Sequence, residues 1–426
     1  MAPIADHPLR YMLANELHAR PFPTLTAPCR AAYLALKPSQ QAASRDKGAD
    51  RRHLLALLDR FGAAHPQPDA THYFGPIGKY VLKWESHTEF VTYTIFGEGV
   101  ADKPFEGSAF SFFPDDWLAG APGQRVTSAL IRVEIAATDD GIDEKAADWF
   151  VPESLAMSRV VDDAAIVATD FRIDQRGHLR VAVFVRPDTG GRRVGRVVQR
   201  LCEIETYKTM AMLGLARARE MGPRLGELDD ELSQLVSGMS HDEVRPADTL
   251  HRLLAMSAEL EGLASRSSFR FGATTAYEAI VNQRIEVLRE VRFKGRQTLA
   301  EFMMRRFDPA MRTVKSTERR MEGMAQRAMR AGDLLRTRVD VERSAENQAL
   351  LESMDRRADL QLRLQQTVEG LSVVAISYYA VNLVVYLLTP VAERLHWSKT
   401  ALAAGATLPV LLAVWGMIRR IRKRLH

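Results

Sequence analysis

The chain has 426 residues, 46% of them hydrophobic, so it is long enough for two or three domains with apolar cores. The formal net charge of +5 lies in the tail: residues 419–424 (RRIRKR) carry five of the 58 Lys and Arg, and the remaining 53 balance the 53 Asp and Glu. A nucleic-acid surface is therefore not expected. The two distant cysteines, Cys29 and Cys202, exclude a disulfide framework and a thiolate zinc cluster.

Residues 26–190 alternate β-rich runs with turn clusters, which predicts a mixed α/β domain over residues 1–195. The candidate strands are Arg30–Leu36, Tyr80–Trp84, Glu89–Phe96, Ser128–Ile135, Ile166–Arg172 and Leu179–Arg186, with a helix near His53. The start of the chain lacks the features of a secretory signal, so this domain is expected in the cytoplasm. A Walker lysine loop, a nucleophile elbow and a dinucleotide fingerprint are also missing, so neither an enzymatic activity nor an organic cofactor is predicted.

Three potential metal ligands, Glu85, His87 and Glu89, occupy alternating positions of a predicted strand over residues 83–91. Because side chains of a strand alternate between its two faces, all three would share one face and could hold a divalent ion. A solvated strand face is the alternative interpretation of the same pattern.

From Arg196 onward the pattern is helical, which predicts a helical domain over residues 196–308. Asp308-Pro309 predicts a break, because Pro fits the first turn of a new helix. Residues 309–367 are then expected to form a stalk helix that continues into the apolar segment after it. A helix of that length is expected to coil against its own copies or against the preceding helices.

Two segments near the carboxyl terminus, residues 370–389 and 400–418, carry no formal charge, and each is long enough to cross a hydrocarbon layer of about 30 Å as a helix. We predict transmembrane helices over residues 368–389 and 400–418, followed by a basic cytoplasmic tail over residues 419–426. Basic residues beside a span favour the cytoplasmic side, and Arg356, Arg357 and Arg363 before the first span agree with the tail. Both termini are therefore expected in the cytoplasm.

One heptad face of the stalk and of the first span is dominated by small and polar residues. The pore-lining candidates on this face are Asp333, Asp340, Ser344, Asn347, Gln361, Gln365, Ser372, Tyr379 and Asn382. Polar groups at membrane depth are costly unless they are paired or wetted, so they would either join packed helices or line a watery path. If copies surround an axis, these oxygens would suit a hydrated divalent cation such as Mg²⁺, the one ligand that the sequence suggests.

Four segments carry a resemblance that covers nearly the whole chain. They are His7–Pro23 (HPLRYMLANELHARPFP), Lys83–Thr94 (KWESHTEFVTYT), Arg200–Leu215 (RLCEIETYKTMAMLGL) and Leu360–Tyr379 (LQLRLQQTVEGLSVVAISYY). With these segments the chain resembles an uncharacterised bacterial family of predicted membrane-anchored proteins, defined by domain of unknown function 3422. The resemblance implies the bacterial inner membrane and no established activity.

The layout of a soluble α/β domain, a long stalk helix, two carboxyl-terminal spans and a basic tail is also similar to the CorA family of magnesium channels. That family carries Tyr-Gly-Met-Asn at the end of its first span, and this chain has Tyr379-Ala380-Val381-Asn382 in the middle of its first span. The Tyr and Asn match, whereas the Gly and Met do not. In that family the motif shapes the outer mouth that holds a hydrated ion.

The sequence thus predicts an α+β fold with an amino-terminal mixed α/β domain, a long helical stalk and a two-helix transmembrane hairpin. The leading hypothesis is a homo-oligomeric, multi-pass inner-membrane protein that forms a divalent-cation channel or transporter. The alternative is a non-conducting membrane-anchored scaffold or sensor. A third class, an anchored enzyme, would need a pocket that brings a nucleophile beside a base.

Overall fold

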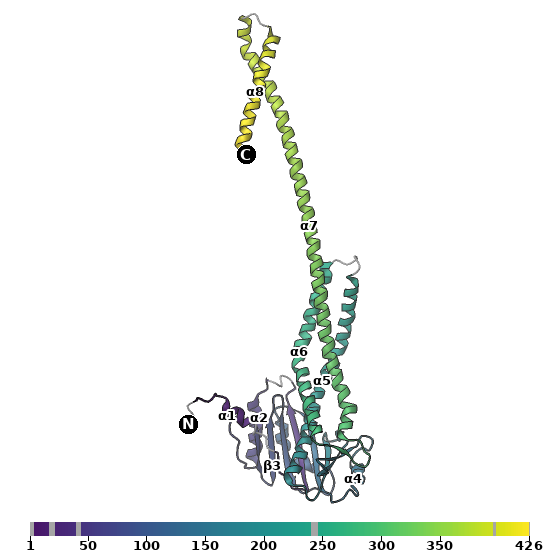
Figure 1. Cartoon of the computed structure of the whole chain (residues 1–426). Helices are drawn as coiled ribbons and strands as arrows, with labels where there is room; N and C mark the ends of the chain where they lie inside the picture. The colour runs from purple at the N-terminus through teal and green to yellow at the C-terminus, as the bar shows by residue number, and fades with distance from the viewer. Residues whose placement is uncertain (1–3, 17–21, 40–43, 240–245, 395–397, 426) are drawn as a thin grey trace. The chain divides into compact units, whose positions relative to one another are not determined.

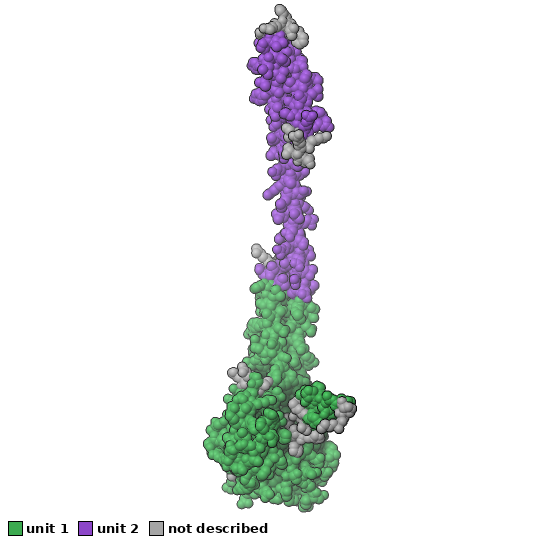
Figure 2. All heavy atoms as spheres, turned by 90° about the vertical axis from the view of Figure 1, so that its left-hand side faces the viewer, with its two compact units in different colours: residues 1–243, 251–331 green, residues 244–250, 332–426 purple. Residues whose placement is uncertain are grey.

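The computed structural model describes residues 4–16, 22–39, 44–239, 246–394 and 398–425. The chain divides into two compact units, one of residues 1–243 and 251–331 and the other of residues 244–250 and 332–426 (Figure 2). The first unit contains a β-sheet with helices, and the second contains the end of one long helix and the terminal helix (Figure 1). This combination is the predicted α+β fold.

The sheet of the first unit has nine strands within the described residues, in the order β2-β3-β4-β1-β5-β8-β7-β6-β9. Neighbouring strands are antiparallel except β5 and β8, which are parallel. The strands are β1 (Cys29–Lys37), β2 (His72–Ile77), β3 (Tyr80–Ser86), β4 (Val91–Glu98), β5 (Gln124–Ile135), β6 (Ala156–Val160), β7 (Ala165–Thr169), β8 (Leu179–Val185) and β9 (Val291–Arg292).

All six predicted strands are present, with shifted ends. Two predicted strand ends are corrected. The strand predicted to end at Arg172 ends at Thr169, and the strand predicted to begin at Glu89 begins at Val91. The sequence missed β2, β6 and β9. The missed β2 contains Gly75 and Pro76, which are typical of a turn, but it lies at the edge of the sheet, where a proline without an N–H is tolerated.

One face of the sheet is covered by α2 (Lys47–Arg60) and α3 (Asp115–Ala119), and a second core cluster contains residues of α4 (Ile142–Trp149). Asp46 caps α2 by accepting a hydrogen bond from the Gly48 N–H at 2.8 Å. Leu54, Leu57 and Leu58 of α2 pack on alternate residues of the strands, such as Leu34 of β1.

His53 of α2 is a polar group inside this core. Its Nδ1 lies 3.0 Å from Tyr93 Oη, and its Nε2 lies 3.0 Å from the carbonyl oxygen of Trp117. Because a carbonyl only accepts, Nε2 carries the proton and Nδ1 accepts from the tyrosine. Burial lowers the pKa of His53 below its ordinary value, so the buried ring is neutral.

The helix α5 (Gly191–Gly238) packs against β5 through Thr127, whose hydroxyl donates to Glu205 Oε1 at 3.0 Å. The helix α6 (Pro246–Glu286) is joined to it by Arg284, which donates to Glu203. A short helix α1 (Arg10–Glu16) and a 3-10 turn η2 (Gly107–Phe112) complete the described helices of the first unit, apart from the start of α7.

The long helix α7 runs from Leu299 to Arg394. The predicted break at Asp308-Pro309 is therefore wrong, because Pro309 lies inside this helix. A proline removes one backbone hydrogen bond and costs about 3 kcal/mol in a helix interior, which packing can offset. Buried residues such as Phe307, Met311 and Val314 supply such packing on both sides of Pro309.

In the second unit the end of α7 and α8 (Lys399–Leu425) form a hairpin. Both helices are long and apolar enough to cross a membrane. Ser377 of α7 and Val414 of α8 are buried in this hairpin, at 5% and 7% exposure. Val373, Ala380 and Val384, which are partly buried, extend the same side of α7 at spacings of about one helical turn.

Candidate functional site

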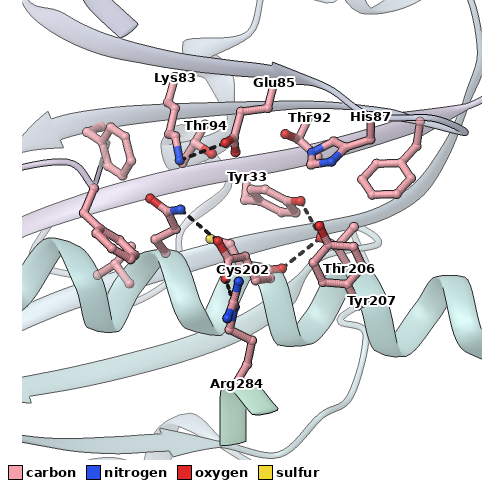
Figure 3. A pocket seen from close by; sticks show the side chains of 16 residues that line it. Tyr33, Lys83, Glu85, His87, Thr92, Thr94, Cys202, Thr206, Tyr207 and Arg284 are labelled. Atoms are coloured by element: carbon pink, nitrogen blue, oxygen red, sulfur yellow. Dashed lines mark hydrogen bonds and ion pairs between the residues drawn. The ribbon is translucent and has the colours of Figure 1, made fainter. Parts of the chain in front are cut away.

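A cavity of about 180 Å³ lies in the first unit, between the sheet and α5 (Figure 3). Strands β1, β3 and β4 form one wall, and α5 with Arg284 of α6 forms the other. The lining residues are Phe22, Tyr33, Lys83, Glu85, His87, Phe90, Thr92, Thr94, Phe96, Val198, Gln199, Cys202, Glu203, Thr206, Tyr207 and Arg284. Rings and charged groups thus share one small space.

Strand register places the polar side chains of the wall side by side. Lys83 of β3 pairs with Thr94 of β4, and Thr94 pairs with Tyr33 of β1. Paired residues of neighbouring strands point to the same face, so these three side chains form one row. Glu85 and Thr92 form the next row on the same face, two residues along each strand.

Lys83 is the least satisfied charged group of the cavity. It is 5% exposed, and its Nζ lies 3.2 Å from Glu85 Oε1. The angles at this contact are not those of a hydrogen bond, and Nζ makes none with any group in the described part of the chain. An ammonium has three N–H donors, so Lys83 presents donors to the cavity that none of the described residues accepts.

The opposite wall contains a second unsatisfied atom. Gln199 Nε2 donates to Glu203 Oε1 at 2.8 Å, and Arg284 Nε donates to Glu203 Oε2. The other end of the same amide, Gln199 Oε1, is buried and has no donor within the described residues. The cavity therefore combines a buried donor on one wall with a buried acceptor on the other.

Three of the hydroxyl and thiol groups of the cavity, those of Tyr33, Cys202 and Thr206, remain protonated. Thr206 Oγ1 donates to the carbonyl oxygen of Cys202 at 2.8 Å, so Tyr33 Oη is the donor in its bond to Thr206. Burial raises the pKa of the Cys202 thiol, and burial also raises the pKa of Tyr33. A neutral thiol is a poor nucleophile, so burial makes the Cys202 thiol a poor nucleophile.

The three predicted metal ligands do not share a strand face, which corrects the prediction. Only Glu85 lies in β3, which ends at Ser86, and His87 and Glu89 lie in the turn that leads to β4. Glu85 and His87 line the cavity, whereas the fully buried Glu89 accepts hydrogen bonds from Arg270 and Tyr277. Among the described residues, no group of three or more His, Cys, Asp and Glu side chains is placed to hold a metal ion.

The predicted pore-lining residues all lie on α7, as expected: Asp333, Asp340, Ser344, Asn347, Gln361, Gln365, Ser372, Tyr379 and Asn382. Ser344 Oγ donates to the Asp340 carbonyl oxygen at 2.8 Å, and Asn382 Nδ2 donates to the Tyr378 carbonyl oxygen at 3.1 Å. Ser372 and Tyr379 are exposed, while the hairpin contact with α8 uses Ser377. Within one chain these side chains therefore do not surround a path.

Sequence reasoning missed most of the cavity, including Lys83, Gln199, Cys202, Thr206 and Arg284. One signal was present in the sequence. Three of the four segments that carry the family resemblance, His7–Pro23, Lys83–Thr94 and Arg200–Leu215, contribute lining residues to this one cavity.

Comparison with known proteins agrees with that resemblance. A search of the curated proteins finds no match to the chain. The family described as "Protein of unknown function (DUF3422)" matches residues 5–425, which is nearly the entire chain. The chain therefore belongs to this uncharacterised family, and its two apolar helices could cross a membrane.

Proposed function

We propose that the chain is a homo-oligomeric, membrane-anchored sensor, whose copies associate through α7 and whose soluble unit binds a small molecule. The observation that supports association is an exposed apolar stripe on α7. Its residues are Leu350, Met354, Leu364, Val368 and Leu371, and each is more than half exposed. At 3.6 residues per turn they fall within about 100° of the helix circumference.

The opposite side of the same segment carries the charges of Glu352, Asp355, Arg356, Asp359 and Arg363, and Arg357 is the one charged residue within the stripe. A helix with one apolar side and one charged side is stable when another element covers the apolar side, and burying one Leu or Val side chain contributes about 1.5–3 kcal/mol. Residues 340–368 are exposed on every side within one chain. The stripe therefore favours a partner.

A second copy of the chain is the partner that the geometry favours. Each copy continues from this stripe into the same membrane-spanning segment, so copies in one membrane would be parallel and at equal height. Identical stripes would then meet in register, as in a parallel coiled coil. Gln361 and Gln365 lie on the same side as the stripe, where polar layers between copies would fix that register.

The side of α7 that carries the stripe continues into the first membrane span. At the helical repeat, Ser372, Tyr379 and Asn382 lie on the side of the stripe, whereas Ser377 and Val384 of the hairpin contact lie on the opposite side. Because α8 covers the opposite side, the polar face of the span is left for contact between copies. Polar side chains are common contacts between packed membrane helices.

The mass of the full chain in detergent, measured by light scattering, tests this proposal. The wild type is expected to be an oligomer, and Leu364→Lys on the stripe is expected to shift it toward the monomer. Gln366→Lys is the matched control, because it adds the same charge two residues away on the opposite side of the helix. A monomeric wild type would refute the association.

Membrane orientation is a separate part of the proposal. The basic residues from Arg419 to Arg424 favour a tail on the cytoplasmic side of the bacterial inner membrane, and a two-span hairpin returns the chain to the side from which it started. Reporter fusions at the two ends of the chain should both report the cytoplasm. A periplasmic signal from either end would contradict this topology.

A cation path is the second candidate function, and the position of Ser372, Tyr379 and Asn382 opposite the hairpin contact favours it. If several copies surround an axis, the oxygens of these residues would ring it and suit a hydrated divalent cation such as Mg²⁺. The similarity to the CorA family stays a prediction.

Flux of Mg²⁺ into liposomes that contain the purified protein tests the path. Asn382→Leu and Ser372→Leu should reduce the flux, and Val374→Leu on an apolar, exposed side of the span is the control. Wild-type flux equal to that of empty vesicles would remove this candidate.

A further inference from the structure

We infer that the cavity beside α5 binds a small zwitterionic amino acid, with the ligand carboxylate at Lys83 and the ligand ammonium toward Glu85 and Gln199. This inference rests on the sensor role proposed above and names the ligand class of that sensor. Four observations support it: an unused buried donor, an unused buried acceptor, the charge balance of the walls, and the size and lining of the cavity.

The unused donor is the ammonium of Lys83. A buried charge is costly unless it is paired and hydrogen-bonded, and among the described residues Lys83 has only the ion-pair contact with Glu85. Native proteins satisfy most buried polar atoms, so an unsatisfied one inside a cavity requires an explanation. A carboxylate oxygen in the cavity would accept from Lys83 Nζ and supply the missing bonds.

The unused acceptor is Gln199 Oε1. A 180° flip of the side-chain amide would not satisfy this oxygen, because the amide nitrogen is needed as the donor to Glu203 Oε1 at 2.8 Å. Turning it over would place two oxygens against each other. A ligand that donates a hydrogen bond would satisfy Gln199 Oε1, so the ligand needs a donor as well as a carboxylate.

Among molecules that carry both a carboxylate and a hydrogen-bond donor, the charges of the cavity walls favour a zwitterion. The walls carry two cations and two carboxylates in the pairs Lys83 with Glu85 and Arg284 with Glu203. A simple anion would approach Glu85 and Glu203, and a simple cation would approach Lys83 and Arg284, and each approach brings like charges together at an electrostatic cost. A zwitterion leaves the total charge unchanged and can align its two ends with an existing pair.

The volume and the aromatic lining of the cavity limit the size and polarity of the ligand's side chain. A volume of about 180 Å³ is close to the roughly 150 Å³ of a cavity that holds one benzene molecule, so the ligand is a single small molecule such as an amino acid. The rings of Phe90, Phe96 and Tyr207 line the same cavity. They would contact an apolar side chain, so leucine, valine and methionine are the preferred candidates.

Isothermal titration of the full chain in detergent with the common L-amino acids, one at a time, tests the inference. At least one apolar amino acid should bind. Its 2-hydroxy analogue, which keeps the carboxylate but loses the positive charge, should bind roughly tenfold or more weakly, and the matching simple carboxylic acid and simple amine should not bind.

Variants then locate the site. Lys83→Met should weaken binding roughly 10- to 100-fold, the loss expected for a hydrogen bond to a charged group. It also removes the counter-charge of Glu85, whose side chain is 13% exposed, so a lower unfolding temperature is expected and is measured alongside the affinity. Gln199→Leu tests the acceptor independently if Lys83→Met does not fold, and Lys79→Met, at an exposed lysine of the β2–β3 turn, should bind as the wild type does.

Three outcomes would overturn the inference: no amino acid binds, the 2-hydroxy acid binds as tightly as the amino acid, or both Lys83→Met and Gln199→Leu keep wild-type affinity. These results leave the mass of the complex in detergent unchanged. Failure of the ligand class is therefore distinguishable from failure of the proposed association.

Discussion

Arg270→Met should destabilise the first unit strongly, because it would leave a buried carboxylate without its counter-charge. Glu89 is fully buried in the turn between β3 and β4, and Arg270 of α6 donates to both of its oxygens. The side chains of this pair are 0% and 16% exposed. After the substitution the Tyr277 hydroxyl, 2.8 Å from Glu89 Oε1, would be the one side-chain group of the described residues that still donates to the carboxylate.

The burial of this ion pair sets the expected loss in the free energy of unfolding. Removing one partner of a buried ion pair costs about 3–5 kcal/mol, because the remaining charge is neither hydrated nor paired. For a domain of this size such a loss lowers the unfolding temperature by roughly 5–10 °C. Thermal unfolding of the full chain in detergent, followed by calorimetry, measures this change.

Two further variants show whether the buried charge is the cause. Arg270→Met combined with Glu89→Gln should recover most of the lost stability, because a neutral amide still accepts from Tyr277 and leaves no unpaired charge. Arg252→Met removes an arginine from a largely exposed pair with Glu231 and should change little. If Arg270→Met behaves like Arg252→Met, the reasoning about Glu89 is wrong.

Three other predictions concern single residues of the first unit. Because burial lowers the pKa of His53, the unfolded chain binds a proton near pH 6.5 while the folded chain does not, so stability should fall as the pH drops below about 6.5. His53→Gln should flatten this fall in unfolding temperature, and an unchanged pH profile would contradict the neutral buried ring. Gly195→Ala should destabilise by at least about 1–3 kcal/mol, because its Cβ would lie 1.7 Å from the Pro23 carbonyl oxygen. Gly226→Ala in the same helix meets nothing within 4 Å and should stabilise by about 0.5–1 kcal/mol, so equal effects of the two in denaturant titrations would contradict this packing. Iodoacetamide should modify Cys202 only on unfolding, because burial raises the pKa of the thiol, and rapid labelling of the native protein, detected by mass spectrometry, would show that the thiol is accessible.

The sequence by itself determined the features that depend on local pattern. β-rich runs between turn clusters located six strands of the sheet, and two uncharged segments located the helices that could cross a membrane. These properties reside in neighbouring residues, so no distant contact is needed to recognise them. The same local reasoning failed at Pro309 and at β2, because packing in one case and an edge position in the other override the usual effect of proline.

Only the tertiary structure decided which side chains meet. Lys83 and Gln199 are more than a hundred positions apart, and Glu89 and Arg270 are further apart still. Sheet register and the packing of α5 and α6 bring each pair to one place, and no spacing in the sequence encodes such a meeting. Glu89 is therefore a buried ion-pair partner of Arg270 instead of a metal ligand. Lys83, which the sequence did not single out, carries the unsatisfied charge of the cavity among the described residues. Proximity of residues distant in sequence arises from the whole fold, which is the physical reason that the candidate site could not be read from the chain alone.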